Sequence, residues 1–238
     1  MKGGRGDPHD NPVLVALDMG TAEAAVRMAK ALLPYVGGFK VGLELLMGPG
    51  PAAVAAVGAL GKPVLADAKL HDIPTTAGRA ARRLAALGAR WVTAHALGGR
   101  SMLESVRQEL EEEAGGRPAG VLAVTVLTSL GDSELAEAGL GTTGKLTSRL
   151  ARLALAAGCE GVICSPRELL VVGQVAPRLR KVTPGIRIEG SPLDDQVRVA
   201  SAEDALRHGA DLVVVGRAVT RAADPVEAAA RLAQQVQV

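Results

Sequence analysis

Aromatic side chains and cysteines are nearly absent from this 238-residue chain. Tyr35, Phe39 and Trp91 are its only Tyr, Phe and Trp residues, so the core must be built from Ala, Val and Leu. Aromatic platforms that stack bases or sugars are therefore not available at scale. Cys159 and Cys164 are too few for a disulfide framework and have no His or Cys neighbour at metal-ligand spacing. We expect two ordinary buried thiols.

An excess of charge of one sign is also lacking. The chain has 27 basic and 25 acidic residues and a formal net charge of +2, which argues against nucleic acid as a partner. No apolar run reaches about 18 residues and no signal-type apolar segment follows Met1, so we expect a cytoplasmic protein without a membrane partner. Arg79, Arg82 and Arg83 have helical spacing and predict a solvated helix face.

Residues 1–12 are polar and glycine-rich and end in proline, which predicts a flexible N-terminal leader before one catalytic domain over residues 13–238. In that domain, short β-branched runs alternate with helical patterns rich in Ala, Leu and Arg. The predicted strands are 13–18, 39–44, 63–68, 90–95, 120–126, 160–164, 180–183 and 211–216. The predicted helices lie near 21–34, 50–60, 74–87, 99–113, 143–157, 166–173, 201–208 and 225–236.

Strand followed by helix, repeated eight times, predicts an α/β fold with a parallel sheet whose faces are covered by helices. Eight such units close more naturally into a (β/α)₈ TIM barrel than into an open, doubly wound sheet, and the length is close to the roughly 250 residues typical of such a barrel. The longest interruption, residues 128–143, follows the fifth strand. A long loop in that position is a candidate lid over a site.

The third predicted strand carries the most informative charges. The segment V-L-A-D-A-K-L-H-D-I-P-T-T at 64–76 places Asp67, Lys69 and Asp72 close together at the end of an apolar strand. Side chains two apart on a strand share a face, so Asp67 and Lys69 point the same way. Buried charges are costly unless they are matched, which favours a functional site. An ion pair that only stabilises the mouth of a barrel has the same pattern.

Polar residues also lie on or directly after the other predicted strands, and they collect at the end of the barrel where active sites form. They are Asp18, Lys40, His95, Thr128, Arg187 and the pair Gly216–Arg217. The segments T-P-G-I-R at 183–187 and V-V-V-G-R-A-V-T at 213–220 combine a glycine with an arginine after strands seven and eight, where barrels commonly bind phosphate. They predict a phosphorylated small molecule as ligand, although two ordinary turns with surface arginines fit the same pattern.

With these residues in place, the chain closely resembles the orotidine 5′-phosphate decarboxylase family over nearly its whole length after the leader. The matching segments are A-L-D at 16–18, F-K-V-G at 39–42, D-A-K-L-H-D-I-P-T-T at 67–76, T-S after the fifth strand, V-T-P-G-I-R at 182–187, D-Q-V-R at 195–198 and V-G-R-A-V-T at 215–220. The resemblance implies decarboxylation of orotidine 5′-phosphate to UMP in de novo pyrimidine biosynthesis. It also implies a homodimer with shared active sites and no metal or organic cofactor.

The resemblance assigns the catalytic work to Lys69, Asp67, Asp72 and Lys40. Lys69 is implied as the proton donor to C6 of the pyrimidine, in a Lys/Asp array that stabilises the C6 carbanion. Asp67 is implied to lie against the departing carboxylate, and Asp72 to reach into the neighbouring subunit's site.

The remaining assignments concern substrate binding. The implied contacts are Asp18 and Lys40 with the ribose hydroxyls, Ile73 and Thr76 beside Asp72, Thr128 at the pyrimidine edge, and Arg187, Gln196, Gly216 and Arg217 with the phosphate. His71 is expected to have a structural or interface role, and His95 to shape the barrel mouth rather than to act as an acid or base.

Two other functions fit parts of the pattern. A Mg²⁺-dependent sugar-phosphate decarboxylase or aldolase on the same barrel shares the D-x-K-x-x-D strand, but it needs further carboxylates around the metal. Glu44, on the second predicted strand, is the candidate for that role. A non-catalytic nucleotide-binding barrel is the other alternative, but binding alone does not require an Asp-Lys-Asp array. The I-P-T-T that follows Asp72 favours the pyrimidine enzyme.

Overall fold

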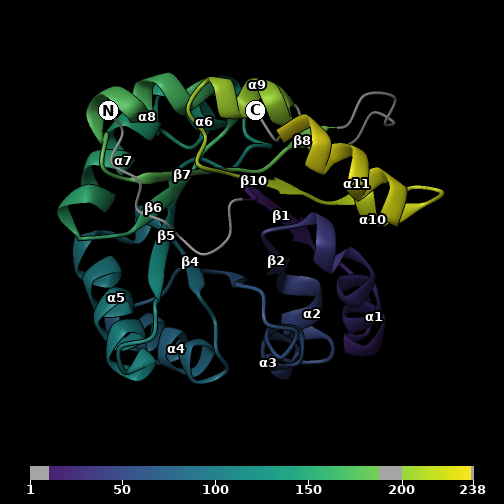
Figure 1. Cartoon of the computed structure of the whole chain (residues 1–238). Coiled ribbons are helices and arrows are strands. Elements are labelled where there is room, and N and C mark those ends of the chain that lie inside the picture. Colours follow the sequence, from purple (N-terminus) through teal and green to yellow (C-terminus); the bar gives the residue numbers. More distant parts are fainter. Residues whose placement is uncertain (1–10, 188–199, 237–238) are drawn as a thin grey trace.

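A closed barrel of eight parallel strands forms the centre of the protein, with helices on the outside (Figure 1). The computed structural model describes residues 11–187 and 200–236. Around the barrel, the strands follow the order β1 (Val13–Ala16), β10 (Leu212–Val215), β7 (Arg180–Thr183), β6 (Gly161–Ile163), β5 (Gly120–Val124), β4 (Trp91–His95), β3 (Val64–Leu70) and β2 (Gly38–Val41). Strand β2 pairs with β1 and closes the ring. The predicted (β/α)₈ barrel is confirmed.

Helices connect the successive barrel strands, and two more follow the last strand. They are α1 (Ala22–Leu32), α2 (Leu43–Met47), α3 (Ala52–Gly58), α4 (Pro74–Ala86), α5 (Arg100–Ala114), α6 (Asp132–Glu137), α7 (Thr143–Ala156), α8 (Leu169–Val175), α9 (Ala202–Arg207), α10 (Arg217–Thr220) and α11 (Pro225–Val236). Single 3₁₀ turns are η1 (Leu33–Tyr35), η2 (Ala96–Gly98) and η3 (Pro166–Glu168). Two short strands, β8 (Ile186–Arg187) and β9 (Ala200–Ser201), pair outside the barrel.

Two predictions about these elements need correction. The second strand ends at Val41 and not at residue 44, because α2 begins at Leu43; Glu44 therefore lies on a helix. The long interruption at 128–143 contains α6, whose first turn is capped by the Glu134 carboxylate accepting from the Gly131 N–H. Asn11, at the end of the predicted leader, hydrogen-bonds to the Tyr35 carbonyl.

Along each strand, successive side chains face opposite sides, so they alternate between the barrel interior and the layer against the helices. The outward-facing side chains pack against the helices in one large apolar cluster. The inward-facing cluster fills the barrel and consists of Leu14, Ala16, Leu65, Trp91, Leu122, Val182, Leu212 and Val214. Two residues beyond Ala16 and Leu65, the same inward rows reach Asp18 and Asp67. The middle of the barrel interior is thus apolar, and its end at the carboxyl ends of the strands is charged.

A polar network surrounds Glu160, next to the first residue of β6 at the amino-terminal end of the barrel. Arg90 donates two hydrogen bonds to the Glu160 carboxylate, at 2.7 and 2.8 Å, and Trp91 Nε1 donates a third at 2.9 Å. The Arg90 guanidinium also lies 4.5 Å from the centroid of the Trp91 ring. Gly120 leaves room for this carboxylate, because a Cβ there would lie 2.1 Å from Glu160 Oε2. The network closes the barrel at the end opposite to its charged rows.

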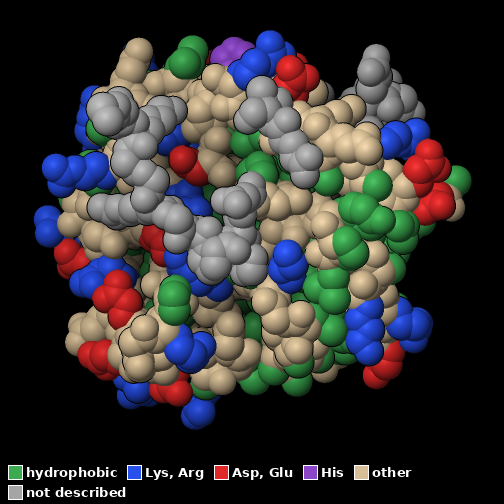
Figure 2. Space-filling view, viewed as in Figure 1, with side chains coloured by type: hydrophobic (Ala, Val, Ile, Leu, Met, Phe, Trp, Pro, Cys, Tyr) green, Lys and Arg blue, Asp and Glu red, His purple; other side chains and the backbone are tan. Residues whose placement is uncertain are grey.

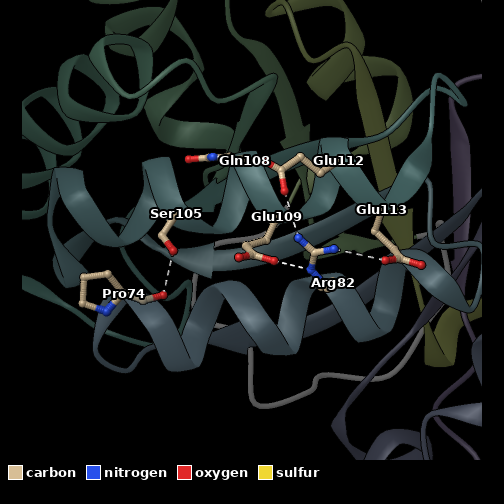
Figure 3. A network of polar contacts seen from close by, with 7 residues as sticks. All are labelled: Pro74, Arg82, Ser105, Gln108, Glu109, Glu112 and Glu113. Atoms are coloured by element: carbon tan, nitrogen blue, oxygen red, sulfur yellow. Dashed lines mark hydrogen bonds and ion pairs between the residues drawn. The ribbon is translucent and has the colours of Figure 1, made fainter.

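Helices α4 and α5 pack closely on the outside, and Arg82 joins them (Figure 3). Its guanidinium on α4 pairs with Glu109, with Glu112 at 2.9 Å and with Glu113 at 3.5 Å, all on α5. The helices approach at Gly78, where a Cβ would lie 2.5 Å from Ser105 Oγ. On the face that was predicted to be solvated, the Arg82 side chain is 39% exposed and also forms ion pairs with partners that are distant in sequence.

The surface and the two thiols agree with the composition. On the face shown in Figure 2, basic and acidic side chains are interspersed. Cys159 and Cys164 are both buried and unpaired, and burial raises the pKa of each thiol to about 12. In the described ranges, 11–187 and 200–236, no helix is long and apolar enough to span a membrane.

Candidate active site

Four charged side chains from three neighbouring strands form a continuous array at the carboxyl end of the barrel. Lys40 Nζ on β2 lies 3.0 Å from Asp18 Oδ1, just after β1, and 3.5 Å from Asp67 Oδ2 on β3. Lys69 Nζ lies 2.7 Å from the same Asp67 oxygen. The order of charges is therefore Asp18, Lys40, Asp67 and Lys69, with opposite signs alternating. The structure brings these four predicted residues together.

Asp67 is the buried centre of this array, with 8% of its surface exposed. Burial on its own opposes ionisation of a carboxyl group. The charges of Lys40 and Lys69 outweigh that effect, together with hydrogen bonds from Lys69 and Thr93, and the pKa of Asp67 is lowered from its ordinary value. Asp67 is thus held as a carboxylate between two ammonium groups, where it can fix their positions.

Gly42, two residues after Lys40, makes room for the pair on β1 and β2. A Cβ at this position would lie 2.6 Å from Lys40 Nζ and 2.7 Å from Asp18 Oδ1. Glycine therefore permits the close approach of these two side chains. The sequence analysis included Gly42 in a matching segment but gave it no function; its place two residues after Lys40, just beyond the end of β2, was the available signal.

Lys69 adopts an unusual backbone conformation. Its φ of +47° is the one positive φ of a non-glycine residue in the described part of the chain. The register between β3 and β4 shifts at this point: Ala66 pairs with Val92, but Leu70 pairs with Ala94. Non-glycine residues in the left-handed region are uncommon and collect at functional sites. The irregularity aims the Lys69 ammonium at Asp67 instead of continuing a regular strand.

Thr93 on β4 supports both charged groups and was missed in the sequence reading. The Lys69 N–H donates to Thr93 Oγ1 at 2.9 Å, and that hydroxyl donates to Asp67 Oδ1 at 2.9 Å. Thr93 is completely buried. It shares the inward row of β4 with Trp91 and His95, and this alternation was the signal that could have identified it.

Asp72, Ile73 and Thr76 are exposed and lie apart from this array within the chain. The Asp72 carboxylate accepts from the Ile73 N–H at 2.7 Å, where α4 begins, and makes no ion pair with the described residues. Ile73 is 67% exposed, which is unusual for a large apolar side chain. Within one chain, Lys69 forms an ion pair with Asp67; the expected role of Asp72 in the neighbouring subunit's site stays a prediction.

His71 and His95 face each other near Lys69. Their ring centroids are 5.3 Å apart. Burial, followed by the nearby His71 and Lys69 charges, lowers the pKa of His95 from 6.5. The lowered pKa favours the neutral form of the imidazole. A neutral imidazole beside Lys69 adds no further positive charge; the expectation that His95 shapes the barrel mouth stays a prediction.

The predicted phosphate residues follow β7 and β10, which are neighbours in the barrel. Gly185 has a φ of +80°, so the turn after β7 uses a conformation that glycine readily adopts. Gly216 directly precedes α10, and the partly buried Arg217 is the first residue of that helix. The backbone of Arg187 pairs with Ser201, while Gln196 lies outside the described residues. Thr128 is half-buried beyond the end of β5.

The donor set does not resemble a cage for a hard cation. Over residues 11–187 and 200–236, no three His, Cys, Asp or Glu side chains converge in a metal-binding group. Glu44, the residue considered for such a site, is exposed on α2. The Asp67 carboxylate has two ammonium groups and a hydroxyl around it, which is an environment suited to balancing charge.

The comparisons with known proteins agree over nearly the whole chain. The model of the orotidine 5′-phosphate decarboxylase / HUMPS family matches residues 11–232. The orotidine 5′-phosphate decarboxylase of Anaeromyxobacter sp. strain K is 47% identical over 223 residues, covering 93% of this chain and 96% of the relative. The enzyme of the same name from Thermobifida fusca is 44% identical, covering 95% of this chain and 96% of the relative.

Solved structures extend this similarity to the fold. The crystal structure of orotidine 5′-phosphate decarboxylase from Lactobacillus acidophilus superimposes with a TM-score of 0.84 at 33% identity. The alignment covers 96% of this chain and all of that chain (100%). The Pyrococcus horikoshii enzyme of the same name gives a TM-score of 0.75 at 26% identity, covering 95% and 99% of the two chains.

Proposed function

This chain belongs to the orotidine 5′-phosphate decarboxylase / HUMPS family, and we propose that its charged array removes CO₂ from orotidine 5′-phosphate without a cofactor. The reaction forms UMP in pyrimidine biosynthesis and makes the protein a carboxy-lyase. The observation that carries the mechanism is the unbroken series of contacts from Asp18 through Lys40 and Asp67 to Lys69.

The chemistry explains why such an array is useful. When the bond between C6 and the carboxyl carbon breaks, CO₂ leaves and the electron pair remains on C6, in the plane of the ring. The π-system cannot absorb that pair, so a site without an electron-accepting cofactor must supply electrostatic stabilisation and a proton. An ammonium group fixed near C6 supplies both.

Lys69 is proposed as that group. Its ammonium stabilises the developing charge and then transfers a proton to C6, which completes UMP; the neutral lysine recovers a proton from solvent. Asp67 keeps the ammonium oriented through the 2.7 Å contact and lies against the departing carboxylate. Asp67 is ionised and largely buried, so it repels the C6 carboxylate of the substrate that lies against it. Loss of CO₂ removes this repulsion.

The rest of the site is proposed to hold the nucleotide. Lys40 and Asp18 bind the ribose hydroxyls, and Thr128 contacts the edge of the pyrimidine. The phosphate is bound after β7 and β10 by Arg187, Gln196, Gly216 and Arg217. Binding of this distant group supplies energy that can be used to order the reacting end of the substrate.

The alternative of a Mg²⁺-dependent sugar-phosphate enzyme is less well supported. The curated relatives described above are named orotidine 5′-phosphate decarboxylase. Asp67 is matched by lysines instead of by further carboxylates, and Glu44 lies on α2. A barrel that only binds nucleotides is also less well supported, because it gains nothing from a buried Asp–Lys pair beside the base.

The test is to mix the purified protein with orotidine 5′-phosphate and follow the loss of its ultraviolet absorbance, with and without EDTA. We expect equal turnover in both samples and UMP as product. Activity that disappears in EDTA and returns with Mg²⁺ would support the metal-dependent alternative. Binding of UMP without any turnover would support the non-catalytic barrel.

We also propose that the protein is a homodimer whose active sites are shared. Five large apolar side chains are exposed on segments that follow β2, β3, β4 and β5: Leu43, Met47, Ile73, Leu97 and Leu127. These strands are neighbours in the barrel, so the five residues form an apolar rim at one end of it. A second copy that covers the apolar rim would place its exposed Asp72 near the other subunit's site.

Mixing inactive variants tests the shared site. If Lys69 of one chain works with Asp72 of the partner subunit, a heterodimer of Lys69→Ala and Asp72→Ala has one site with both defects and one intact site. Random exchange gives about half heterodimers, so roughly a quarter of wild-type activity should return. Lys69→Ala mixed with Asp67→Ala is the matched control, because each mixed site keeps one defect. No recovery after confirmed subunit exchange would contradict the shared site.

The predicted cytoplasmic location stays a prediction. Fractionation of cells that express the protein at its natural level would test it: the decarboxylase activity should appear with cytoplasmic marker enzymes.

A further inference from the structure

Thr93 occupies a place in the site to which neither the sequence reading nor the proposed mechanism gave a role. It lies on β4, is completely buried, and has Trp91 below it and His95 above it on the same inward row. Its hydroxyl accepts a hydrogen bond from the Lys69 N–H and donates one to Asp67 Oδ1, both at 2.9 Å. A single hydroxyl therefore touches the backbone of the proposed proton donor and the side chain of its counterion.

The first of these contacts stabilises an unfavourable backbone conformation. Lys69 has a φ of +47°, and the regular pairing of β3 with β4 is interrupted between Ala66 and Leu70. A strand N–H in such an interruption loses its usual carbonyl partner, and a buried donor must be paired elsewhere. The hydroxyl of Thr93 takes the place of that carbonyl.

The second contact fixes the orientation of the Asp67 carboxylate. Thr93 occupies Oδ1, which leaves Oδ2 to face Lys69 at 2.7 Å and Lys40 at 3.5 Å. Without the hydroxyl, Oδ1 would remain buried without this partner and the carboxylate would be free to rotate. The ammonium groups of Lys69 and Lys40 would then no longer be held by a carboxylate of fixed orientation.

We propose that Thr93 is a positioning residue for the decarboxylation, which holds the Asp67 carboxylate and the Lys69 backbone in the geometry needed for charge stabilisation and proton transfer. The proposal rests on the proposed function of the array. Thr93 does not touch the substrate in this account; it acts through Asp67 and Lys69.

Four residues at position 93 separate the hydroxyl from its packing. Val conserves the volume of Thr but lacks the hydroxyl, Ser keeps the hydroxyl but lacks the methyl group, and Ala lacks both. We expect kcat to fall by about 10- to 100-fold in Thr93→Val and Thr93→Ala, which is the range for a lost hydrogen bond to a charged group. Thr93→Ser should stay within about threefold of wild type, because the charged hydrogen bond remains.

A packing role predicts the opposite order, with Val close to wild type and Ser close to Ala. Even if the Val variant does not fold, the comparison of Ser with Ala isolates the hydroxyl, since both lack the methyl group. Positioning also predicts that kcat falls by a much larger factor than the affinity for UMP, because UMP keeps the proposed ribose contacts with Lys40 and Asp18 but has no C6 carboxyl group to meet Asp67 and Lys69. A parallel weakening of UMP binding would overturn the proposal.

Thr125→Val is the matched control. Thr125 is also buried, and its hydroxyl donates to the Ile163 carbonyl at 2.8 Å without contacting the array. The backbone N–H of Thr125 donates to the same carbonyl, which keeps a partner in the variant. This variant should keep the wild-type kcat. If Thr125→Val loses as much activity as Thr93→Val does, then removing any buried hydroxyl lowers activity, and the proposal is wrong.

The outcomes distinguish this inference from the proposed function. Wild-type protein without decarboxylase activity would overturn the proposed function. Active wild-type protein with an equally active Thr93→Val variant would overturn the role of Thr93 alone. In an Asp67→Asn background, adding Thr93→Val should lower the residual kcat much less than in wild type, because the two residues act as one unit. If Thr93→Val lowered kcat by the same factor in Asp67→Asn as in wild type, the result would contradict the inference.

Discussion

Glu160→Gln should destabilise the protein without impairing catalysis, because its network closes the barrel at the end opposite to the charged array. Glu160 is bound by Arg90 through two hydrogen bonds, by Trp91 through a third, and lies 3.5 Å from Arg180. Its side chain is 25% exposed. Glutamine can keep one or two of these contacts but not the charge.

The magnitude follows from the contacts that are lost. A hydrogen bond to a charged group contributes about 1.5–3 kcal/mol net, and removing one partner of a well-buried ion pair costs about 3–5 kcal/mol. Because part of the network is hydrated and glutamine still accepts a hydrogen bond, we expect the free energy of unfolding to fall by about 2–3 kcal/mol. Glu227→Gln, in an exposed pair with Arg231 on α11, is the control and should change stability little.

The pH dependence gives a second check. Burial opposes ionisation of Glu160, but the hydrogen bonds from Arg90 and Trp91 and the charges of Arg90 and Arg180 outweigh it, and the pKa is lowered from 4.5. A lowered pKa in the folded state contributes stability that is fully present above the unfolded value and is lost as the pH falls through the folded value. The difference between wild type and Glu160→Gln should therefore be constant from pH 8 to about 6 and shrink below about 4.5.

Chemical denaturation followed by circular dichroism and by the fluorescence of Trp91, the single tryptophan, measures the difference. Turnover of orotidine 5′-phosphate by the folded variant should equal that of wild type. The reasoning would be refuted if Glu160→Gln were as stable as Glu227→Gln, or if its stability deficit grew as the pH fell below 4.5.

Two further variants probe the site. Gly42→Ala should lower kcat/KM by about tenfold or more while the protein still folds, because the new Cβ displaces the flexible ends of Lys40 and Asp18. Gly173→Ala is the control and should keep wild-type kinetics, because the space around its Cβ is open. Equal kinetics in both variants would contradict the role of Gly42. Arg217→Ala should weaken transition-state binding of orotidine 5′-phosphate by several kcal/mol, as expected for a lost phosphate contact, and the deficit should shrink on orotidine; an equal loss on both substrates would show that Arg217 acts elsewhere.

The sequence pattern is sufficient for the architecture because it repeats. Eight alternations of strand and helix specify the parallel barrel, and period two along each strand predicts that Asp67 and Lys69 share a face. Where a strand stops is harder to predict. Gly42 alone separates β2 from α2, so Glu44, predicted to lie on a strand, lies on a helix.

The features that the sequence reading missed depend on contacts between distant residues. Thr93 bonds to Asp67 across 26 residues, and Arg82 on α4 meets Glu109 on α5 across 27. The positive φ of Lys69 also follows from such a contact, since local preference disfavours it and the pairing shift between β3 and β4 imposes it. Local patterns carry no information about these partners.

Lys69→Ala tests the central claim most directly. Its rate of decarboxylation should be measured by the loss of orotidine 5′-phosphate absorbance, and its affinity for UMP by calorimetry on the same sample. We expect turnover to fall to the level of the protein-free control while UMP binding is retained, because the ammonium is lost and the phosphate segments after β7 and β10 are untouched. Turnover near that of wild type in a folded Lys69→Ala variant would contradict the mechanism.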